Sequence, residues 1–269
     1  MSRIACGLTI SLALICGACE QKPAPTLAPT ASALGSAAPK AATAAPFGVD
    51  SGTSSVKFLM DSPLEKIDGD APGALSGELF VDPSDLTKSS GLLKIDLDKL
   101  TLYQQKRGGE AEAYGERKKS DAQNQHARGW FQLDAKDGET TPEQAQMNRF
   151  AEFKLDTLET ATPDVSKLSG AERKVSATIN GDFRLHGRKA KKSAKIELVF
   201  KYAGEKLESI QVKSVEPVPV SLDEFEVHPR DDTGKLLKTV TEAIATNLKG
   251  KISNLAPVSF EFSAKPKAP

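Results

Sequence analysis

The stretch from Val175 to Phe200, VSATINGDFRLHGRKAKKSAKIELVF, decides the fold of this chain. Apolar residues or glycine stand at every second position from Val175 to Leu185, and the alternation returns from Ala194 to Phe200. Such alternation is typical of a strand with one face buried and the other in water. The polar face of the first run would carry Ser176, Thr178, Asn180, Asp182, Arg184 and His186. Because a polar, basic loop after Gly187 separates the two runs, the stretch predicts a β-hairpin.

Shorter alternating runs along the rest of the chain predict further strands. They are centred on residues 56–60, 79–81, 93–97, 151–157, 210–212, 218–222 and 258–262. The segment 61–77 contains prolines and glycines, so we expect it to connect two strands. Pro217 and Pro219 place the strand that follows them at an edge or a sharp bend. Eight or nine strands separated by turns predict an all-β sandwich or barrel.

Helical spacing is found in a single stretch, which lies near the C-terminus. Its apolar residues are Leu236, Leu237, Val240, Ile244 and Leu248, followed by Gly250 as a stop. The polar segment 104–125 predicts either a surface loop or a short exposed helix, and 134–147 predicts a polar insertion. Between these segments, Trp130 and Phe131 return the chain to the core.

The first 18 residues have the layout of a secretory signal peptide, with a basic start at Arg3, an apolar run and small residues before Cys19. The run Ile15-Cys16-Gly17-Ala18-Cys19 resembles a bacterial lipobox, in which the last cysteine is acylated and becomes the new N-terminus. Here Cys16 stands where the lipobox usually has leucine, and ordinary signal-peptidase cleavage is the alternative. All three cysteines lie in this leader, and acylation would account for Cys19, which the mature chain keeps. We therefore expect Cys19 to be lipidated and the protein to be exported, anchored to a membrane at the periplasmic or outer-envelope face.

After the leader, the sequence divides into three parts. Residues 19–50 comprise acylated Cys19 and a segment rich in Ala, Pro, Thr and Ser, which has too little apolar surface to offset its ordering entropy. We expect this segment to be a disordered tether. Order should begin near Ser54, residues 51–265 should form the barrel domain, and residues 266–269 should be a frayed tail.

The charge balance argues against nucleic acid as a partner. The chain has 36 basic and 36 acidic side chains, whereas a nucleic-acid-binding domain normally has a basic excess. Basic residues do crowd the central hairpin, namely Arg184, Arg188, Lys189, Lys191, Lys192 and Lys195. This cluster would be either a solvated turn or a cationic rim that attracts anionic lipid headgroups.

The sequence contains no recognisable catalytic or metal-binding motif. Its three histidines, His126, His186 and His228, are far apart and lack the spacing of a ligand set. No nucleophile elbow or phosphate-binding loop is present. We predict a protein that is not an enzyme and needs no cofactor or metal. An enzyme would require titratable groups to converge, for example His126 and His186 with a carboxylate.

The ordered part of the chain resembles the YceI-like family of exported bacterial proteins associated with polyisoprenoid lipids. The strongest match is Ile179-Asn180-Gly181-Asp182-Phe183-Arg184-Leu185-His186-Gly187. Softer matches precede it in the family's order, at 90–100, 123–128 followed by Phe131, and 149–153. The chain departs from the pattern at Asn148-Arg149, in the apparent insertion 134–147, and at Arg188-Lys189-Ala190. The family's motif positions fall on His126, Arg128, Phe131, Asp182, His186 and Gly187.

The resemblance implies an extended antiparallel β-barrel of about eight strands, lipocalin-like in shape, with one or two short helices. Its long apolar interior would hold an isoprenoid chain. The residues expected to line that interior are Phe58, Leu97, Phe153, Ile179, Phe183, Leu185, Phe200 and Phe260. Their periodicity is equally compatible with a barrel filled by its own side chains, because alternation identifies a face and not a cavity.

Three functional hypotheses follow. The first is an exported lipoprotein whose barrel binds an apolar chain, a polyisoprenoid or similar lipid, without catalysis. The second is a structural or interaction lipoprotein of the envelope with a filled barrel and no ligand. The third is an envelope enzyme. The sequence leaves the oligomeric state open.

Overall fold

The predicted hairpin is present, and its two strands pair along their whole length. β8 (Glu172–Leu185) and β9 (Arg188–Ala203) run antiparallel from the pair Leu185–Arg188 to the pair Glu172–Lys201. Only His186 and Gly187 separate the strands, with φ angles of 50° and 67°. Two successive positive φ angles are characteristic of a type I′ turn, whose twist suits the flanking strands. The prediction of a polar loop after Gly187 is therefore wrong, because the basic residues that follow Gly187 lie on β9 itself.

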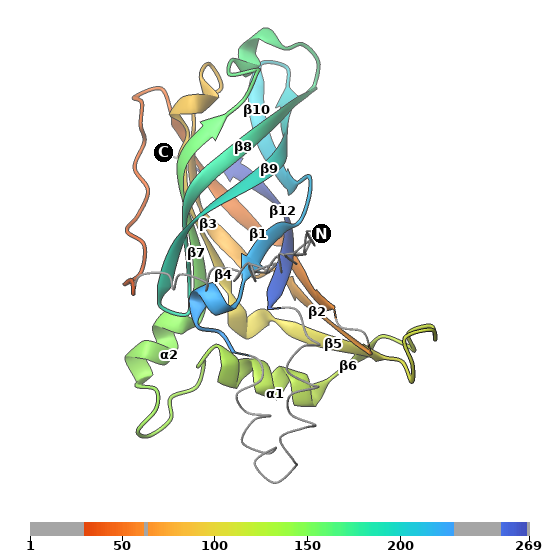
Figure 1. Cartoon of the computed structure of the whole chain (residues 1–269). Helices are drawn as coiled ribbons and strands as arrows, with labels where there is room; N and C mark the ends of the chain where they lie inside the picture. The colour runs from red at the N-terminus through yellow and green to blue at the C-terminus, as the bar shows by residue number, and fades with distance from the viewer. Residues whose placement is uncertain (1–29, 62–63, 229–253, 268–269) are drawn as a thin grey trace, which may run out of the picture.

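Eight strands close into a ring in which every neighbouring pair is antiparallel (Figure 1). The structure is a computed structural model and describes residues 30–61, 64–228 and 254–267. Around the ring the strands are β1 (Ala45–Asp61), β3 (Leu75–Val81), β4 (Ser90–Asp96), β7 (Phe150–Glu159), β8, β9, β10 (Lys206–Ser214) and β12 (Leu255–Pro266), and β12 pairs with β1 to close it. The predicted fold, an all-β barrel of about eight strands with short helices, is confirmed.

Four further strands extend the sheet beyond the ring: β2 (Glu65–Pro72), β5 (Thr101–Lys106), β6 (Lys118–Lys119) and β11 (Val218–Ser221). The first half of β1 pairs with β3 and its second half with β2. The pairing of β1 with β12 shifts in register between Asp50 and Ser55. The expectation that 61–77 only connects strands is wrong, because this segment contains β2. Its buried positions are Ile67, Gly69 and Ala71, two of them too small to give a strong apolar signal.

Two short α-helices lie together at one end of the barrel (Figure 1). α1 (Asp121–Trp130) begins at Ser120, whose hydroxyl accepts a hydrogen bond from the Gln123 backbone N–H. α2 (Pro142–Asn148) begins with a capping box between Thr141 and Gln144. α1 begins in the polar segment 104–125, where a short exposed helix was one of the two predictions, and runs on to Trp130, while α2 lies almost wholly in the polar segment 134–147. Four 3₁₀ turns complete the described structure: η1 (Leu86–Lys88), η2 (Leu97–Lys99), η3 (Val165–Lys167) and η4 (Asp223–Phe225).

Several predictions made from the sequence fall outside the described residues. These are the signal peptide, Cys19 and the helix around residues 236–248. Within residues 30–61, 64–228 and 254–267, no helix has the length and apolar character needed to cross a membrane.

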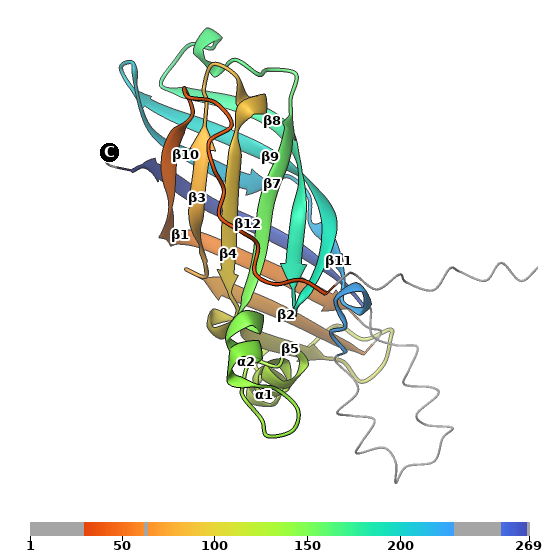
Figure 2. The same ribbon diagram turned by 90° about the vertical axis from the view of Figure 1, so that its left-hand side faces the viewer.

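The N-terminal segment 30–44 does not match the predicted tether. It runs along the outside of the barrel across β4, β7 and β8 (Figure 2). Backbone groups hold it there: Ala31 N–H donates to the Gly187 carbonyl over 2.8 Å, and the Ala38 carbonyl accepts from Ser90 Oγ over 2.6 Å. β1 then begins at Ala45, so the expected start of order near Ser54 is wrong. The composition of this segment predicted disorder, because contacts made by the backbone need no large side chain and leave no signal in the composition.

This segment also buries a charged pair on the outer face of the barrel. Arg184 and Glu152 are cross-strand neighbours on β8 and β7, only 1% and 2% exposed. Leu34 N–H donates to Glu152 Oε2 over 2.7 Å, and Arg184 Nε donates to the Ala31 carbonyl over 3.3 Å. The expectation that Arg184 lies on a water-facing surface is thus wrong, because a second layer of chain covers that surface.

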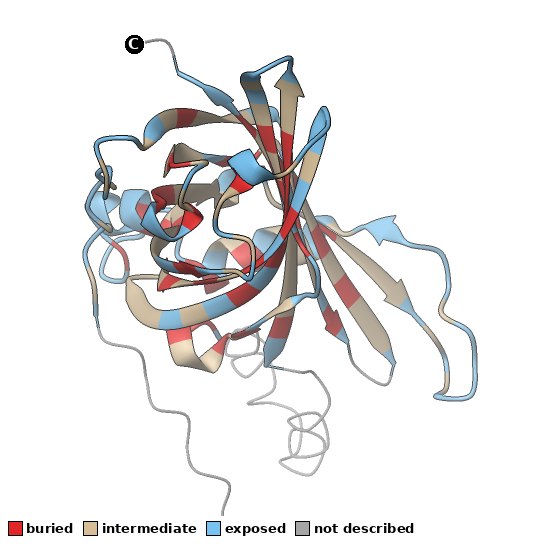
Figure 3. Ribbon diagram, turned by 90° about the horizontal axis from the view of Figure 1, so that it is seen from above, coloured by how far each residue is buried: buried red, intermediate tan, exposed pale blue. Residues whose placement is uncertain are grey.

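Buried residues recur along the strands of the barrel (Figure 3). Their side chains form two clusters inside the ring. One cluster fills the end of the barrel distant from the α-helices, around Phe200, Ile210 and Phe262. The other lies at the end with α1 and includes Trp130 and Phe225. A cavity lies between them.

Candidate functional site

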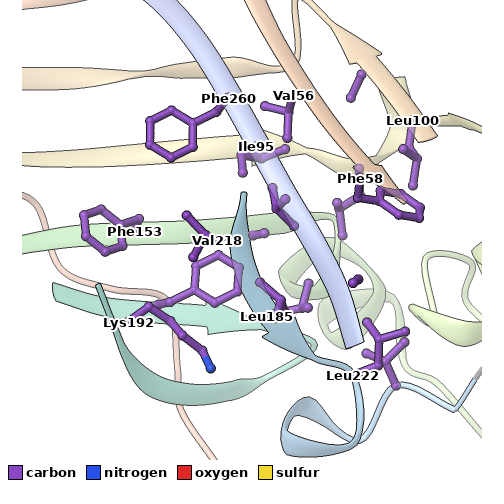
Figure 4. A pocket seen from close by; sticks show the side chains of 18 of the residues that line it. Val56, Phe58, Ile95, Leu100, Phe153, Leu185, Lys192, Val218, Leu222 and Phe260 are labelled. Carbon is purple, nitrogen blue, oxygen red and sulfur yellow. The ribbon is translucent and has the colours of Figure 1, made fainter. Parts of the chain in front are cut away.

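The cavity has a volume of about 160 Å³ and a wall made almost wholly of hydrocarbon (Figure 4). By volume it could hold on the order of ten water-sized groups. Among the described residues its wall comprises Val56, Phe58, Met60, Ala71, Leu75, Leu93, Ile95, Leu97, Leu100, Leu102, Ala127, Trp130, Phe131, Ala151, Phe153, Ile179, Phe183, Leu185, Lys192, Ser193, Ala194, Val218, Val220, Leu222, Val227, Ala256, Val258 and Phe260. Cavities lined in this way stay dry and accept apolar ligands.

Seven of the eight residues expected to line the interior do so: Phe58, Leu97, Phe153, Ile179, Phe183, Leu185 and Phe260. Five of these large inward-facing side chains are only partly buried, namely Phe58, Leu97, Phe153, Phe183 and Phe260. An inward side chain that remains partly uncovered borders empty space and not packed atoms. Whether these residues touch a ligand remains a prediction.

Phe200 is the exception, since it does not line the cavity. It pairs with Arg173 and Ile210 at the filled end of the barrel and is completely buried. It faces inward as expected but lies in the packed layer. Alternation along a strand therefore gave the correct face but not the depth.

The position of Phe153 depends on the absence of a side chain at Gly181. In the inward series of β8, Gly181 stands between Ile179 and Phe183. A Cβ atom at Gly181 would lie 2.7 Å from Phe153 Cζ and 2.2 Å from the Lys154 carbonyl oxygen. The neighbouring Phe183 is fixed from the other side by Phe225, in an edge-to-face contact with ring centroids 5.4 Å apart.

Helix α1 closes the cavity at the end of the barrel where the α-helices lie. Ala127, Trp130 and Phe131, which follows the helix, line the cavity there. Asn124 holds the helix on β5, since its Oδ1 accepts from the Leu102 N–H over 2.9 Å and its Nδ2 donates to the Leu102 carbonyl over 3.1 Å. This role was missed, because the polar segment 104–125, in which the helix begins, predicted a surface loop or a short exposed helix. The signal that could have located it is the spacing of Ala127, Trp130 and Phe131.

The motif positions His126 and Arg128, both on α1, lie outside the cavity. Arg128 donates to both carboxylate oxygens of Asp134, over 2.8 and 2.6 Å, and to Asp98 over 3.0 Å. His126 is exposed, with its ring 6.3 Å from that of Trp130. Arg128 thus orients the helix end, and Phe131 is the α1 motif position that reaches the cavity.

The motif positions in the hairpin serve the turn and the outer face. Asp182 pairs with Lys191 over 2.8 Å and with Lys189 over 3.6 Å. His186 Nδ1 lies 3.1 Å from the Phe225 carbonyl, which fixes the ring beside η4. Burial lowers the pKa of His186, so the neutral imidazole is favoured in the folded protein.

The basic cluster of the hairpin is matched by carboxylates, which leaves little support for a cationic rim. Lys192 is the one charged residue of the described cavity wall, and its amine pairs with Glu224 and lies 5.4 Å from the centroid of the Phe225 ring. Arg188 pairs with Glu226, and Lys195 with Glu216.

The described residues show no convergence of catalytic groups. Within 30–61, 64–228 and 254–267, no group of three or more His, Cys, Asp or Glu side chains is placed to hold a metal ion. His126 lies on α1 and His186 lies in the β8–β9 turn, each with a different neighbour. What the arrangement can do is exclude water from an apolar molecule.

No family model and no curated protein sequence match this chain. Its structure is similar to that of a polyisoprenoid-binding domain from Saccharophagus degradans implicated in plant cell wall breakdown, with a TM-score of 0.50 and 14% identity, over 83% of this chain and 99% of that one. BcnA of Burkholderia cenocepacia is matched with a TM-score of 0.45 and 14% identity, over 80% of this chain and 98% of that one. At 14% identity the likeness to the Saccharophagus degradans domain concerns the fold alone, and for the fold the resemblance to YceI-like barrels is confirmed.

Proposed function

We propose that this protein binds an apolar chain, a polyisoprenoid or similar lipid, inside its barrel and does not transform it. The observation that supports this most strongly is the cavity between the two packed clusters, whose wall is hydrocarbon apart from Lys192 and Ser193. A polar headgroup would find few hydrogen-bond partners in the cavity, whereas a prenyl or acyl chain needs none. The similar barrel from Saccharophagus degradans is described as polyisoprenoid-binding, which agrees with the proposal.

The energetics favour such a ligand. Each methylene transferred from water to the cavity contributes about 0.8 kcal/mol, so ten such groups contribute roughly 8 kcal/mol before the entropic cost of association. No catalytic or charged group is needed for this affinity. A chain longer than the cavity would extend beyond it or widen it.

We further propose that the protein is an exported lipoprotein held to a membrane by acylated Cys19. The proposal rests on the leader sequence and on the cysteine that follows it. Fully extended, the chain between Cys19 and Thr30 would span at most about 40 Å, because segment 30–44 is already fixed to the barrel. The cavity would therefore stay close to the membrane that supplies its ligand. The mass of the mature N-terminus tests the anchor, which is excluded if Cys19 carries no acyl chain.

The binding proposal can be tested by filling the cavity. Ala194 on β9 lines it, whereas Ala203 at the end of the same strand is exposed. In Ala194→Phe the new ring would occupy the space of the ligand, so we expect binding of a C15–C20 isoprenoid hydrocarbon, measured by calorimetry on lipid-free protein, to weaken at least tenfold. Ala203→Phe is the matched control and should bind like the wild type. Equal binding by both variants, or none by the wild type, would contradict the proposal.

A further inference from the structure

Strand pairing among the described residues leaves one stretch of the barrel wall without a ladder. The pairing of β9 with β10 ends at Ile196 and Ser214, beyond which a single hydrogen bond joins the Val215 N–H to the Lys195 carbonyl over 2.9 Å. From 189 to 194, no described strand pairs with β9 on the edge that faces away from β8. The strand that follows in the chain, β11, pairs with β12 and not with β9. Over this length the wall is not closed by backbone hydrogen bonds between β9 and β11, and we call this break the seam.

The cavity lies directly behind the seam. Its wall includes Lys192, Ser193 and Ala194 of β9 on one side, and Val218 and Val220 of β11 on the other. Ser193 is the one exposed residue among the described residues of the wall. The cavity therefore comes close to the protein surface at the seam.

A short segment that follows β11 covers the seam. It comprises residues 222–227, which include η4, and we call it the plug. Both of its ends, Leu222 and Val227, line the cavity. Phe225 between them is completely buried, with its ring edge-to-face against that of Phe183. The plug thus separates this side of the cavity from solvent.

The plug is held in different ways on its two sides. On the side of β12, the Leu222 N–H donates to the Asn254 carbonyl over 2.8 Å. On the side of β9, the described residues form no backbone hydrogen bond with the plug, and ion pairs hold it instead. One of these pairs joins Lys192 to Glu224, whose side chains are 17% and 25% exposed. Because ion pairs between partly exposed side chains are weak, the plug opens most readily on the side of β9.

Lys192 belongs both to this ion pair and to the cavity wall. The wall is almost wholly hydrocarbon, so the methylene stem of Lys192 borders the cavity while its ammonium group extends to Glu224. The two ends of the described barrel offer no such opening. Side chains around Phe200 fill one end, and α1 covers the other.

We propose that the seam is the entrance of the cavity and that the plug is its gate, with the Lys192–Glu224 pair as the latch. A ligand passes sideways between β9 and β11 while the pair is broken and the plug has moved away from β9. The inference rests on the proposed function and adds to it the route by which the ligand enters and leaves.

A latch of this kind controls rates more than affinity. The closed barrel contains the Lys192–Glu224 pair with or without a ligand, so loss of the pair favours opening in both states and leaves the dissociation constant nearly unchanged. One hydrogen-bonded ion pair corresponds to a roughly three- to tenfold change in the rate of opening.

The test measures how fast a hydrocarbon dye enters and leaves the full chain after removal of bound lipid. The dye is diphenylhexatriene, and excitation of Trp130, the single tryptophan and a residue of the cavity wall, transfers energy to dye inside the barrel. Stopped-flow mixing gives the association rate, and displacement by an excess of isoprenoid hydrocarbon gives the dissociation rate. The latch variants are Glu224→Gln, Lys192→Met, which keeps an unbranched stem without the charge, and the two combined. Glu78→Gln on β3 is the control, because it breaks an ion pair on the side of the ring opposite β9.

We expect each single latch variant to raise both rates roughly three- to tenfold and to keep the dissociation constant within about twofold of that of the wild type. The combined variant should go no further than either single one, because both substitutions remove the same pair, and Glu78→Gln should behave like the wild type. Unchanged or slower rates in either single latch variant, an altered affinity without a faster association, or a combined effect equal to the product of the two single effects would each overturn the inference while leaving the cavity function intact. If the wild type takes up neither the dye nor the isoprenoid, the proposed function itself fails.

Discussion

At the scale of single residues, His186 in the β8–β9 turn combines a left-handed backbone conformation with a buried, titratable side chain. His186 has a left-handed φ of 50°, and its Nε2 is buried without a partner among the described residues. The charged groups beside it are Glu226, which raises its pKa, and Arg188, which lowers it, but burial dominates and the pKa is lowered from its ordinary value of 6.5. The folded protein therefore disfavours the imidazolium.

The lowered pKa of His186 makes the free energy of unfolding depend on pH, with higher stability at higher pH. The contribution is complete above pH 6.5 and is lost as the pH falls from there through the lowered pKa, because the unfolded chain takes up the proton first. Between pH 7.5 and 5.5 the wild type should lose up to about 1.4 kcal/mol of unfolding free energy from this group. His186→Asn tolerates the left-handed backbone and should show a flatter pH profile in urea denaturation. Parallel profiles for the two proteins would contradict this account of His186.

At the scale of elements, β7 and β8 can approach closely because Gly181 on β8 has no side chain. The cross-strand contact leaves no room for a methyl group at Gly181, which would meet Phe153 and the Lys154 carbonyl. Gly181→Ala should therefore lower the unfolding free energy by about 1–3 kcal/mol, as overpacking does, and weaken ligand binding by displacing Phe153. Gly35→Ala is the control, since its methyl group would meet nothing within 4 Å. Unchanged stability and binding in Gly181→Ala would show that the Phe153 ring is not held in this way.

The elements also show how far the sequence could predict the structure. Strong alternation identified β8, β9 and most ring strands, because residues such as Val175 and Ile196 differ sharply from their neighbours. It could not find β2, whose inward positions include Gly69 and Ala71. It could not distinguish Phe153 in the cavity from Phe200 in the packed layer, because depth in a barrel depends on the register of all strands.

Contacts made by the backbone were equally invisible in the sequence. Segment 30–44 has the composition of a tether, yet it covers β4, β7 and β8 and buries Arg184. The sequence placed Trp130 and Phe131 in the core, but it did not predict the helix that closes the barrel end, since α1 begins in the polar segment 104–125.

At the scale of the whole molecule, the described barrel has a packed cluster of side chains at each end and a cavity between the two clusters. The cluster around Phe200 and Phe262 fills the end distant from α1, and the cavity lies between this cluster and α1. A barrel partly packed by its own side chains therefore still has room for an apolar chain. The central claim is that a molecule occupies this space in the cell.

Native mass spectrometry of the full-length protein, purified from its own cells without detergent exchange and followed by lipid extraction, tests that claim most directly. We predict one noncovalently bound molecule per barrel, an isoprenoid or similar lipid, in addition to any acyl chains on Cys19. A protein that is ligand-free as isolated, and that takes up no isoprenoid when one is supplied, would contradict the account.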